Sequence, residues 1–423
     1  MSPAGVVLHT VPLVLPVTAA PVWDGAVALA QGRVLAVGPR SELQARFAGA
    51  RRRDWPGVML PGLVNAGTSL QLSTLHDLAS DRPSVWQLPA RVAERFAAMS
   101  GPQRAEAART GAFLALRSGT TALADVVTDP AALSAVARSG LRGTSYLPVE
   151  DIGRTPWGAD LAVVLGAGAT GRDIGVTWTR WSDLDEAGLG RLAELVRGTS
   201  ARVLLPVAET VEEVEYVALG TGRLADRSAS NASPRGPGRL GAGVGRGWSP
   251  VEALDRLGWL GAGTHLTQGV HCDSEDLALL ARRGVSVALS PRSNRLLRVG
   301  RAPVADYLRA GVPLALATGS LAATPSLDLL TEARAARDLA LEQGYDAPDL
   351  AERIVIAATL GGARALGLAD AGRIAPGSRA DLAVFDVVVA GPSAGDPFEE
   401  LLEHGPGACV ATVLAGRIVH RRG

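Results

Sequence analysis

Short apolar runs alternate with stretches of helical periodicity through the middle of the chain. The apolar runs predict buried strands, and apolar residues spaced at i, i+3 and i+4 predict helices, among them 102–118, 185–196 and 274–283. The eight expected strands are 58–66, 120–127, 143–148, 175–181, 203–208, 264–270, 285–289 and 312–318. Strands and helices that alternate in this way predict an α/β fold, a (β/α)8 TIM-like barrel of parallel strands over residues 58–370.

The two ends of the chain differ from the middle in their sequence pattern. Residues 1–57 and 371–423 hold short Val-, Leu- and Ala-rich runs broken by glycines, which predict short strands. We expect both ends to form one small composite β-sandwich domain. Residues 220–247 are rich in Gly, Ser and Pro, so they predict a flexible loop after the fifth barrel strand. Such a loop closes over a barrel mouth in some enzymes and is a disordered insertion in other proteins.

Composition narrows the function classes. The 42 basic and 42 acidic residues balance, and no basic tract or long apolar segment is present, so nucleic acid and membranes are not expected partners. We expect a cytoplasmic protein with two plain buried thiols, Cys272 and Cys409. The chain contains no lysine, which excludes a lysine Schiff base and a carbamylated lysine that bridges two metals.

Five short segments carry motifs at the ends of expected strands. They are L-P-G-L-V-N-A-G-T-S at 60–69, L-P-V-A-E-T at 205–210, L-T-Q-G-V-H-C-D at 266–273, S-P-R-S-N at 290–294 and L-A-T-G-S-L-A at 316–322. These motifs resemble those of the amidohydrolase superfamily of metal-dependent hydrolases. The similar branch holds aminodeoxyfutalosine, S-adenosylhomocysteine and guanine deaminases and the triazine chlorohydrolases. The resemblance implies a barrel with a composite terminal domain and a metal site at the barrel mouth.

The resemblance also fixes which residues stand at the metal and proton-transfer positions of that superfamily. They are Gly67, Ser69, Pro206, Gln268 and Gly319, where the superfamily has histidines and an aspartate. A hydrolytic metal needs about three protein ligands, and these side chains cannot provide them. We therefore predict no metal and no other cofactor, with zinc or iron only if other residues rebuild the site.

Other residues near the expected barrel mouth have polar side chains. Glu209, Gln268 and His271 are the candidates for acid/base work. His76 is expected at the surface or at a helix start, with a functional role as the alternative. The candidates for ligand binding are Ser69, Gln71, Arg292, Ser293, Asn294 and Ser320. Arg292 has two open roles, because its guanidinium can hold a carboxylate or phosphate or can order its loop through a buried ion pair.

Three functions stay open. The main interpretation is an amidohydrolase-like protein with a degenerate metal site, which keeps a small-molecule pocket for binding or regulation. The first alternative is a metal-independent enzyme that performs acid/base or elimination chemistry on a nucleoside-like or carboxylated substrate. The second is an active deaminase, a hydrolase of C–N bonds, with a rebuilt metal site. The expected partners are a small-molecule ligand and either a second copy of the chain or an active paralogue.

Overall fold

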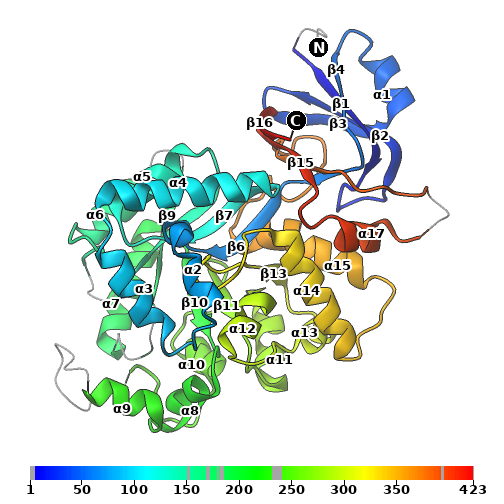
Figure 1. The fold of residues 1–423 in the computed structure, drawn as a ribbon. Helices are drawn as coiled ribbons and strands as arrows, with labels where there is room; N and C mark the ends of the chain where they lie inside the picture. The colour runs from blue at the N-terminus through cyan, green and yellow to red at the C-terminus, as the bar shows by residue number, and fades with distance from the viewer. Residues whose placement is uncertain are drawn as a thin grey trace.

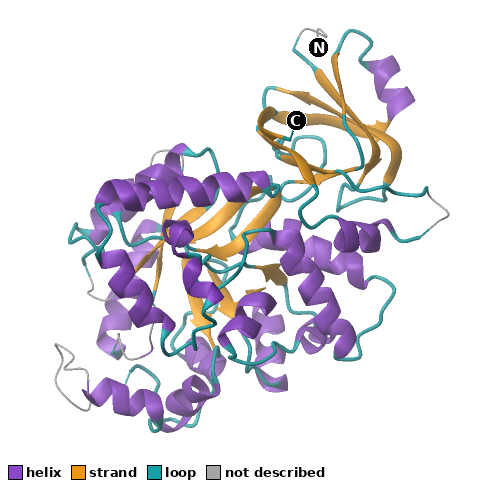
Figure 2. Ribbon diagram, viewed as in Figure 1, coloured by secondary structure: helices purple, strands orange, loops and turns teal. Residues whose placement is uncertain are grey.

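A computed structural model describes residues 5–149, 153–167, 172–178, 181, 185–230, 241–391 and 395–422. It has two parts, a barrel wrapped in helices and a separate sheet that carries both chain ends (Figure 1). Strands lie at the centre of the barrel and helices surround them (Figure 2). Among the described residues, no helix has the length and apolar content needed to cross a membrane.

Eight parallel strands form the barrel in chain order, each next to its predecessor. A bridge between Thr68 and Gly319 joins the first strand to the segment after the eighth. There the Gly319 amide donates to the Gly67 carbonyl at 3.0 Å. The predicted fold class is thus confirmed. The strands are β6 (Leu63–Thr68), β7 (Thr120–Val126), β8 (Thr144–Pro148), β9 (Asp173–Thr177), β10 (Val203–Val207), β11 (Thr264–Gln268), β12 (Ser286–Leu289) and β13 (Leu314–Leu316).

Small side chains fill much of the barrel interior, where facing strands leave little room. Several strands contribute alanines to this core, and Tyr146 on β8 is its largest member. His265 on β11 lies edge-on to Tyr146, and its Nε2 is 3.0 Å from the Ala66 carbonyl oxygen. Burial lowers the pKa of His265 to about 4, so this imidazole is neutral and Nε2 donates. His265 therefore serves the core of the barrel.

Helices cover the barrel between its strands. The predicted helix 274–283 is confirmed, and those at 102–118 and 185–196 have shifted ends. The helices are α2 (Asp77–Ser80), α3 (Leu88–Ala97), α4 (Gly101–Arg117), α5 (Pro130–Arg138), α6 (Leu161–Ala167), α7 (Glu186–Thr199), α8 (Val211–Leu219), α9 (Arg223–Ser230), α10 (Pro250–Arg256), α11 (Ser274–Arg283), α12 (Pro291–Leu297), α13 (Val304–Ala310), α14 (Leu329–Glu342), α15 (Leu350–Ile356), α16 (Gly362–Ala365) and α17 (Pro397–His404), with the 3-10 helix η1 (Leu70–Leu75) and the π-helix η3 (Ala357–Gly361).

Both chain ends build the second sheet, as the sequence predicts. Strands from the two ends meet where β14 pairs with β5, and a core of Val, Leu, Ile and Trp side chains packs against the sheet. The strands are β1 (Val7–Val14), β2 (Val22–Ala30), β3 (Arg33–Pro39), β4 (Arg51–Asp54), β5 (Val58–Pro61), β14 (Leu382–Phe385), β15 (Cys409–Leu414) and β16 (Arg417–Arg421), and helix α1 (Arg40–Arg46) follows β3. The exact domain bounds stay a prediction.

One predicted barrel strand is divided between the two sheets. The apolar run 58–66 forms β5 in the terminal sheet and only then β6 in the barrel. The division falls at Gly62, where a Cβ atom would lie 2.1 Å from the Thr121 hydroxyl oxygen. Only a residue without a side chain allows this close approach. The expectation of one continuous strand is wrong because periodicity cannot locate such a break.

The segment 220–247 differs in part from its predicted loop. Residues Arg223–Ser230 form helix α9, although their polar composition argued against a packed element. Leu224 and Ala225 are partly buried against the main core, which gives this helix an apolar side. Residues 231–240, which hold both prolines of the segment, lie outside the described residues.

Candidate functional site

The superfamily's metal positions meet at the carboxyl ends of the barrel strands, the face where barrel enzymes place their active sites. Gly67 is buried on β6 and points into the barrel. A Cβ atom at Gly67 would lie 3.1 Å from the Ala317 Cβ and 3.1 Å from the Thr267 Cγ2. These distances are tighter than ordinary apolar contacts. Small apolar groups therefore occupy the space around this former ligand position.

Ser69 and Gln71 form hydrogen bonds at the end of the neighbouring strand, β7. The Ser69 hydroxyl donates to the Val126 carbonyl at 2.8 Å. The Gln71 amide donates to the Thr128 hydroxyl at 3.0 Å and accepts from the Thr128 backbone N–H at 3.0 Å. Both side chains thus fasten η1 to the segment after β7. Their predicted role in ligand binding stays a prediction.

Pro206 and Gln268 stand on adjacent strands. Pro206 has no N–H to donate, and β10 tolerates it because the pairing with β9 ends at Leu204. Gln268 ends β11 with a left-handed backbone, at a φ of 75°. Its side chain is half-buried, and its Oε1 has no hydrogen-bond partner among the described residues. A non-glycine residue in this conformation, next to an unmet polar atom, is typical of a functional strand end.

Glu209 follows β10 and is held in place by a second glutamate. The Glu213 carboxylate accepts from the Ala208 and Glu209 backbone N–H groups, each at 2.9 Å, and from the Trp181 indole N–H at 2.9 Å. Burial and the charge of Glu213 raise the pKa of Glu209 to about 7. Glu209 can therefore hold or release a proton near neutral pH.

His271 lies beside this glutamate pair. Its backbone N–H donates to the Ala208 carbonyl at 2.9 Å. Its Nε2 is 2.6 Å from the Val299 carbonyl oxygen, which orients the ring and makes Nε2 the donor of this hydrogen bond. The structure thus brings the three predicted acid/base candidates, Glu209, Gln268 and His271, to two neighbouring strand ends. Their catalytic role stays a prediction.

Asp125 is a buried carboxyl group that sequence reasoning missed. It lies near the end of β7, fully buried, and its Oδ1 accepts from the Leu70 backbone N–H at 2.8 Å. Its Oδ2 has no hydrogen-bond partner among the described residues. Burial raises the pKa of Asp125 to about 7, although the Leu70 N–H and the charge of Arg172 act in the opposite direction. The signal in the sequence was one acidic residue inside an apolar run.

Arg292 is turned into the protein. Its backbone N–H donates to the Glu332 carboxyl at 2.8 Å, and its guanidinium lies 3.7 Å from the same carboxyl group and 3.2 Å from the Ser326 hydroxyl. The side chain is buried. This arrangement favours the second of its two open roles, the ordering of its loop.

The other predicted ligand-binding residues lie around Arg292. A Cβ atom at Gly319 would lie 3.6 Å from the Ser293 hydroxyl oxygen. Asn294 is buried, and neither polar atom of its side chain has a partner among the described residues. Ser320 is half-buried, and its carbonyl accepts from the Ala323 N–H at 2.8 Å. The structure therefore groups Arg292, Ser293 and Asn294 on α12, with Ser293 next to Gly319.

The chain between α2 and α3 covers part of the mouth. Val85 and Leu88 pack against a small apolar cluster that holds Val270, Leu297 and Val299, which follow the sixth and seventh barrel strands. This connection starts from the first barrel strand and reaches the far side of the barrel mouth. Figure 1 shows α2 and α3 in front of the strands.

The donor set at the mouth does not fit a catalytic divalent metal. Among the described residues, no group of three or more His, Cys, Asp or Glu side chains is close enough together to hold a metal ion. His76 is exposed at the N-terminus of α2, as expected from the sequence. Cys272 and Cys409 are both buried and free, as predicted. The absence of a metal and the alternative of a rebuilt metal site therefore both stay predictions.

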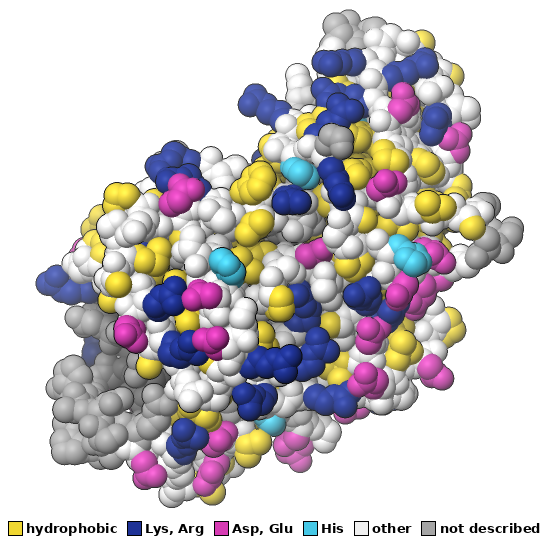
Figure 3. All heavy atoms as spheres, in the orientation of Figure 1, with side chains coloured by type: hydrophobic (Ala, Val, Ile, Leu, Met, Phe, Trp, Pro, Cys, Tyr) yellow, Lys and Arg dark blue, Asp and Glu magenta, His cyan; other side chains and the backbone are white. Residues whose placement is uncertain are grey.

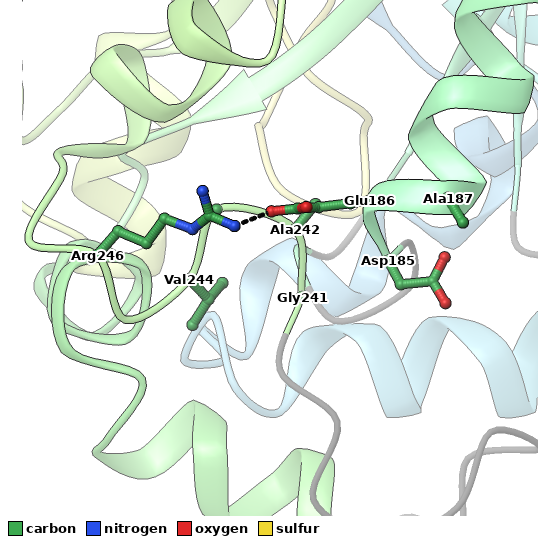
Figure 4. A pocket seen from close by; sticks show the side chains of 8 residues that line it. Asp185, Glu186, Ala187, Gly241, Ala242, Val244 and Arg246 are labelled. Carbon is green, nitrogen blue, oxygen red and sulfur yellow. Dashed lines mark hydrogen bonds and ion pairs between the residues drawn. The ribbon is translucent and has the colours of Figure 1, made fainter.

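A surface hollow of about 390 Å³ lies away from these residues, at the start of α7. Figure 4 shows Arg246 and Glu186 facing each other across it in an ion pair. The Asp185 side chain accepts from the Gly188 N–H at 2.8 Å and caps α7. The charged groups of this hollow thus serve local structure.

Comparisons with known proteins agree with this architecture. The amidohydrolase family model matches residues 239–419, and an imidazolonepropionase-like composite domain of bacteria matches residues 25–50. A relative from Natronomonas pharaonis, named 5-methylthioadenosine/S-adenosylhomocysteine deaminase, is 32% identical over 84% of this chain and 78% of its own length. A relative of the same name from Nitratidesulfovibrio vulgaris is 30% identical over 86% of this chain and 79% of its own length.

Solved structures have the same fold. An adenosine deaminase from Xanthomonas campestris with bound zinc matches with a TM-score of 0.82 and 27% identity, over 98% of this chain and 93% of that chain. Guanine deaminase from E. coli matches with a TM-score of 0.77 and 17% identity, over 99% and 100%, and this likeness shows the fold alone. From the barrel, the composite sheet and these relatives together, the chain belongs to the amidohydrolase family.

Proposed function

We propose that this chain binds a small molecule of the purine-nucleoside class at its barrel mouth without a resident divalent metal. The ligand class comes from the relatives, which are named as deaminases of 5-methylthioadenosine and S-adenosylhomocysteine. The location comes from the strand ends that carry Glu209, Gln268 and His271. Hydrolytic deamination is not part of this proposal.

One observation carries the proposal. The positions that correspond to the family's metal ligands hold Gly67, Ser69, Pro206, Gln268 and Gly319. A divalent ion that activates water needs about three imidazole, carboxylate or thiolate ligands. Glycine and proline offer no side-chain donor atom, and the Ser69 hydroxyl is bound to a backbone carbonyl. The chemistry of this donor set suits hydrogen bonds to a neutral ligand.

Glu209 and Gln268 are the side chains that suit such a ligand. Protonated Glu209 donates one hydrogen bond and accepts others, and the Gln268 amide offers both donors and an acceptor. A purine ring presents the same mixture of donors and acceptors at its edge. Glu213 holds the strand end that carries Glu209, so the carboxyl group approaches the ligand from a fixed position.

An active deaminase is the second candidate. The names of the relatives agree better with this alternative than with loss of the activity, because each relative is called a deaminase. It requires a metal or another group that activates water at this barrel mouth. Glu209, with its pKa raised to about 7, has the proton affinity that an acid/base residue in such a reaction needs.

Calorimetric titration with adenosine and 5-methylthioadenosine, paired with an assay of ammonia release with and without zinc, separates the two candidates. We expect binding without ammonia release. We also expect the affinity of the native chain to change between pH 6 and pH 8, about one unit on either side of the Glu209 pKa of about 7. The Glu209→Gln variant should show a different change over this range. Glu212→Gln, in the first turn of α8, is the matched control. Zinc-dependent ammonia release would establish the second candidate, and absence of nucleoside binding would contradict the proposal.

A further inference from the structure

The terminal sheet buries His9, on β1, completely. The Trp55 indole N–H donates to its Nδ1 at 2.9 Å, so Nδ1 carries no proton. Burial and the charge of Arg53 lower the pKa of His9 to about 4, so the imidazole is neutral and its proton is on Nε2. Nε2 has no hydrogen-bond partner among the described residues. This buried N–H group therefore needs an acceptor from outside them.

Arg53 lies beside His9 on the same face of the sheet. The two residues are register partners in the parallel pair of β4 and β1. Register partners turn their side chains to the same face, as the hydrogen bond from Thr10 to Asp54 shows for the next pair, on the opposite face. Arg53 is half-buried, and its charge acts on the His9 ring. A guanidinium group is therefore close to the buried N–H group.

A second arginine reaches the same place from the other end of the chain. The guanidinium carbon of Arg421, on β16, lies 5.5 Å from the centre of the Trp55 ring. The rings of Trp55 and His9 are stacked, with their centres 6.0 Å apart and their planes at 20°. Trp55 directly follows β4 and comes two positions after Arg53. Residues from β1, β4 and β16 thus meet around the Trp55 ring.

The positive charge at this place is not neutralised by ion pairs within the described part of the chain. Among those residues, no carboxylate pairs with Arg53 or Arg421, whereas Arg33 of the same sheet pairs with Asp370 at 3.1 Å. Asp54, next to Arg53 in the chain, is bound to a hydroxyl group on the opposite face. Figure 3 shows dark-blue side chains over the terminal sheet. An anion bound here would supply both the counter-charge and the acceptor.

We propose that the terminal sheet binds a phosphate-type oxyanion between Arg53 and Arg421, with the His9 Nε2–H group as a third donor. Guanidinium groups suit phosphate oxygens, and hydrogen bonds from charged donors are the stronger ones. Donors from three strands can surround a tetrahedral anion, whereas a carboxylate is flat. The site belongs to the terminal sheet, so it is separate from the barrel mouth and does not depend on the proposed function.

An anion at this site joins strands from both ends of the chain. β1 and β4 lie before the barrel in the sequence, and β16 is the last strand. A ligand that binds only the folded state stabilises that state by mass action. We therefore expect phosphate to raise the melting temperature of the full chain more than chloride does at equal ionic strength.

Calorimetric titration of the full chain with inorganic phosphate tests the site. We expect saturable binding of one phosphate per chain. Arg53→Gln with Arg421→Gln should weaken it at least about tenfold, since two charge-assisted hydrogen bonds are lost. Glycerol phosphate and acetate are the companion probes. Tighter binding of glycerol phosphate than of inorganic phosphate would identify a phosphate ester as the ligand, and acetate that binds as tightly as phosphate would contradict a tetrahedral site.

A matched double variant removes the same charge from the opposite face of the sheet. Arg52 is the register partner of Leu8, which packs in the core beneath α1, and Arg46 of α1 lies 5.2 Å from the centre of the Phe47 ring. Arg46→Gln with Arg52→Gln should leave the affinity for phosphate unchanged. An equal loss in both double variants would indicate attraction to net charge alone and overturn the inference. Absence of phosphate binding by the native chain would also overturn it.

Nitrogen NMR of the chain with labelled histidines follows the third donor. The His9 Nε2–H resonance is identified by its loss in His9→Gln. We expect phosphate to shift this resonance in the native chain and in the Arg46/Arg52 variant, and to leave it in place in the Arg53/Arg421 variant. A resonance that does not move when the native chain is saturated with phosphate would contradict the assignment of His9 to the site.

Discussion

At the scale of single residues, three buried carboxyl groups near the barrel mouth hold protons unusually strongly. Burial raises the pKa values of Asp125, Glu209 and Glu332 to about 7. The folded state therefore binds protons that the unfolded chain has already released above about pH 4. Each group contributes stability that is full below its ordinary pKa and is lost as the pH rises towards 7.

The substitution Asp125→Asn tests whether stability falls as the pH rises. An amide cannot ionise, so the variant lacks the loss of stability that ionisation of Asp125 causes between its ordinary pKa of 3.8 and about 7. We expect the native free energy of unfolding to fall by up to about 1.4 kcal/mol per pH unit more steeply than that of the variant. Urea denaturation at pH 5, 6 and 7 measures both slopes.

Exposed Asp346→Asn is the control for this comparison and should keep the native slope. Parallel slopes for the native chain and Asp125→Asn would show that Asp125 is ionised in the folded state throughout this range.

At the scale of elements, an arginine fastens α14 on the barrel to α17, which leads into the terminal sheet. The Arg337 guanidinium donates to Glu399 at 2.8 Å and to Glu403 at 2.9 Å, and it also contacts Asp338. Arg337 itself is buried, whereas its carboxylate partners are half-exposed. These carboxylates raise the pKa of Arg337, so the group stays charged.

Replacing Arg337 with Gln removes this connection between helices. We expect the free energy of unfolding to fall by about 1–2 kcal/mol, since hydrogen bonds to a charged and largely buried group are lost while the exposed carboxylates regain water. Chemical denaturation measures the loss. Arg301→Gln, which breaks an exposed pair with Glu342, should cost at most about 0.5 kcal/mol. Equal effects of the two substitutions would contradict a special role for Arg337.

The elements also show how far sequence reasoning reaches. Seven of the eight expected barrel strands match strands of the barrel. Each of these seven apolar runs forms a single strand that lies in the barrel sheet alone. The run 58–66 failed because its two halves are equally apolar and belong to different sheets. Helix α9 was missed because most of its residues are polar.

The candidate site was predictable only in part, for a related reason. Motifs located Glu209 and Gln268 because Glu209 lies two residues after β10 and Gln268 ends β11. The Glu213 clamp and the burial of Asp125 depend on which segments meet in space. No local pattern encodes such meetings between distant parts of the chain.

At the scale of the whole molecule, the family fold closes through contacts at the strand ends of the barrel mouth. The barrel closes through backbone contacts at Gly67 and Gly319, and Asn65 donates to the Thr318 hydroxyl at 2.7 Å beside them. None of these contacts needs a metal ion. The fold can therefore be retained for ligand binding, which is the central claim of this account.

The metal content of the purified protein tests that claim most directly. Elemental analysis is made on the full chain as purified and after incubation with zinc, manganese or iron. As a positive control, one variant restores the family's ligands and relieves their crowding, with Gly67→His, Ser69→His, Pro206→His, Gln268→His, Gly319→Asp and Ala317→Gly. We predict metal near zero for the native chain and about one zinc per chain for the restored variant. About one tightly held metal ion in the native chain would contradict the account and support an active deaminase.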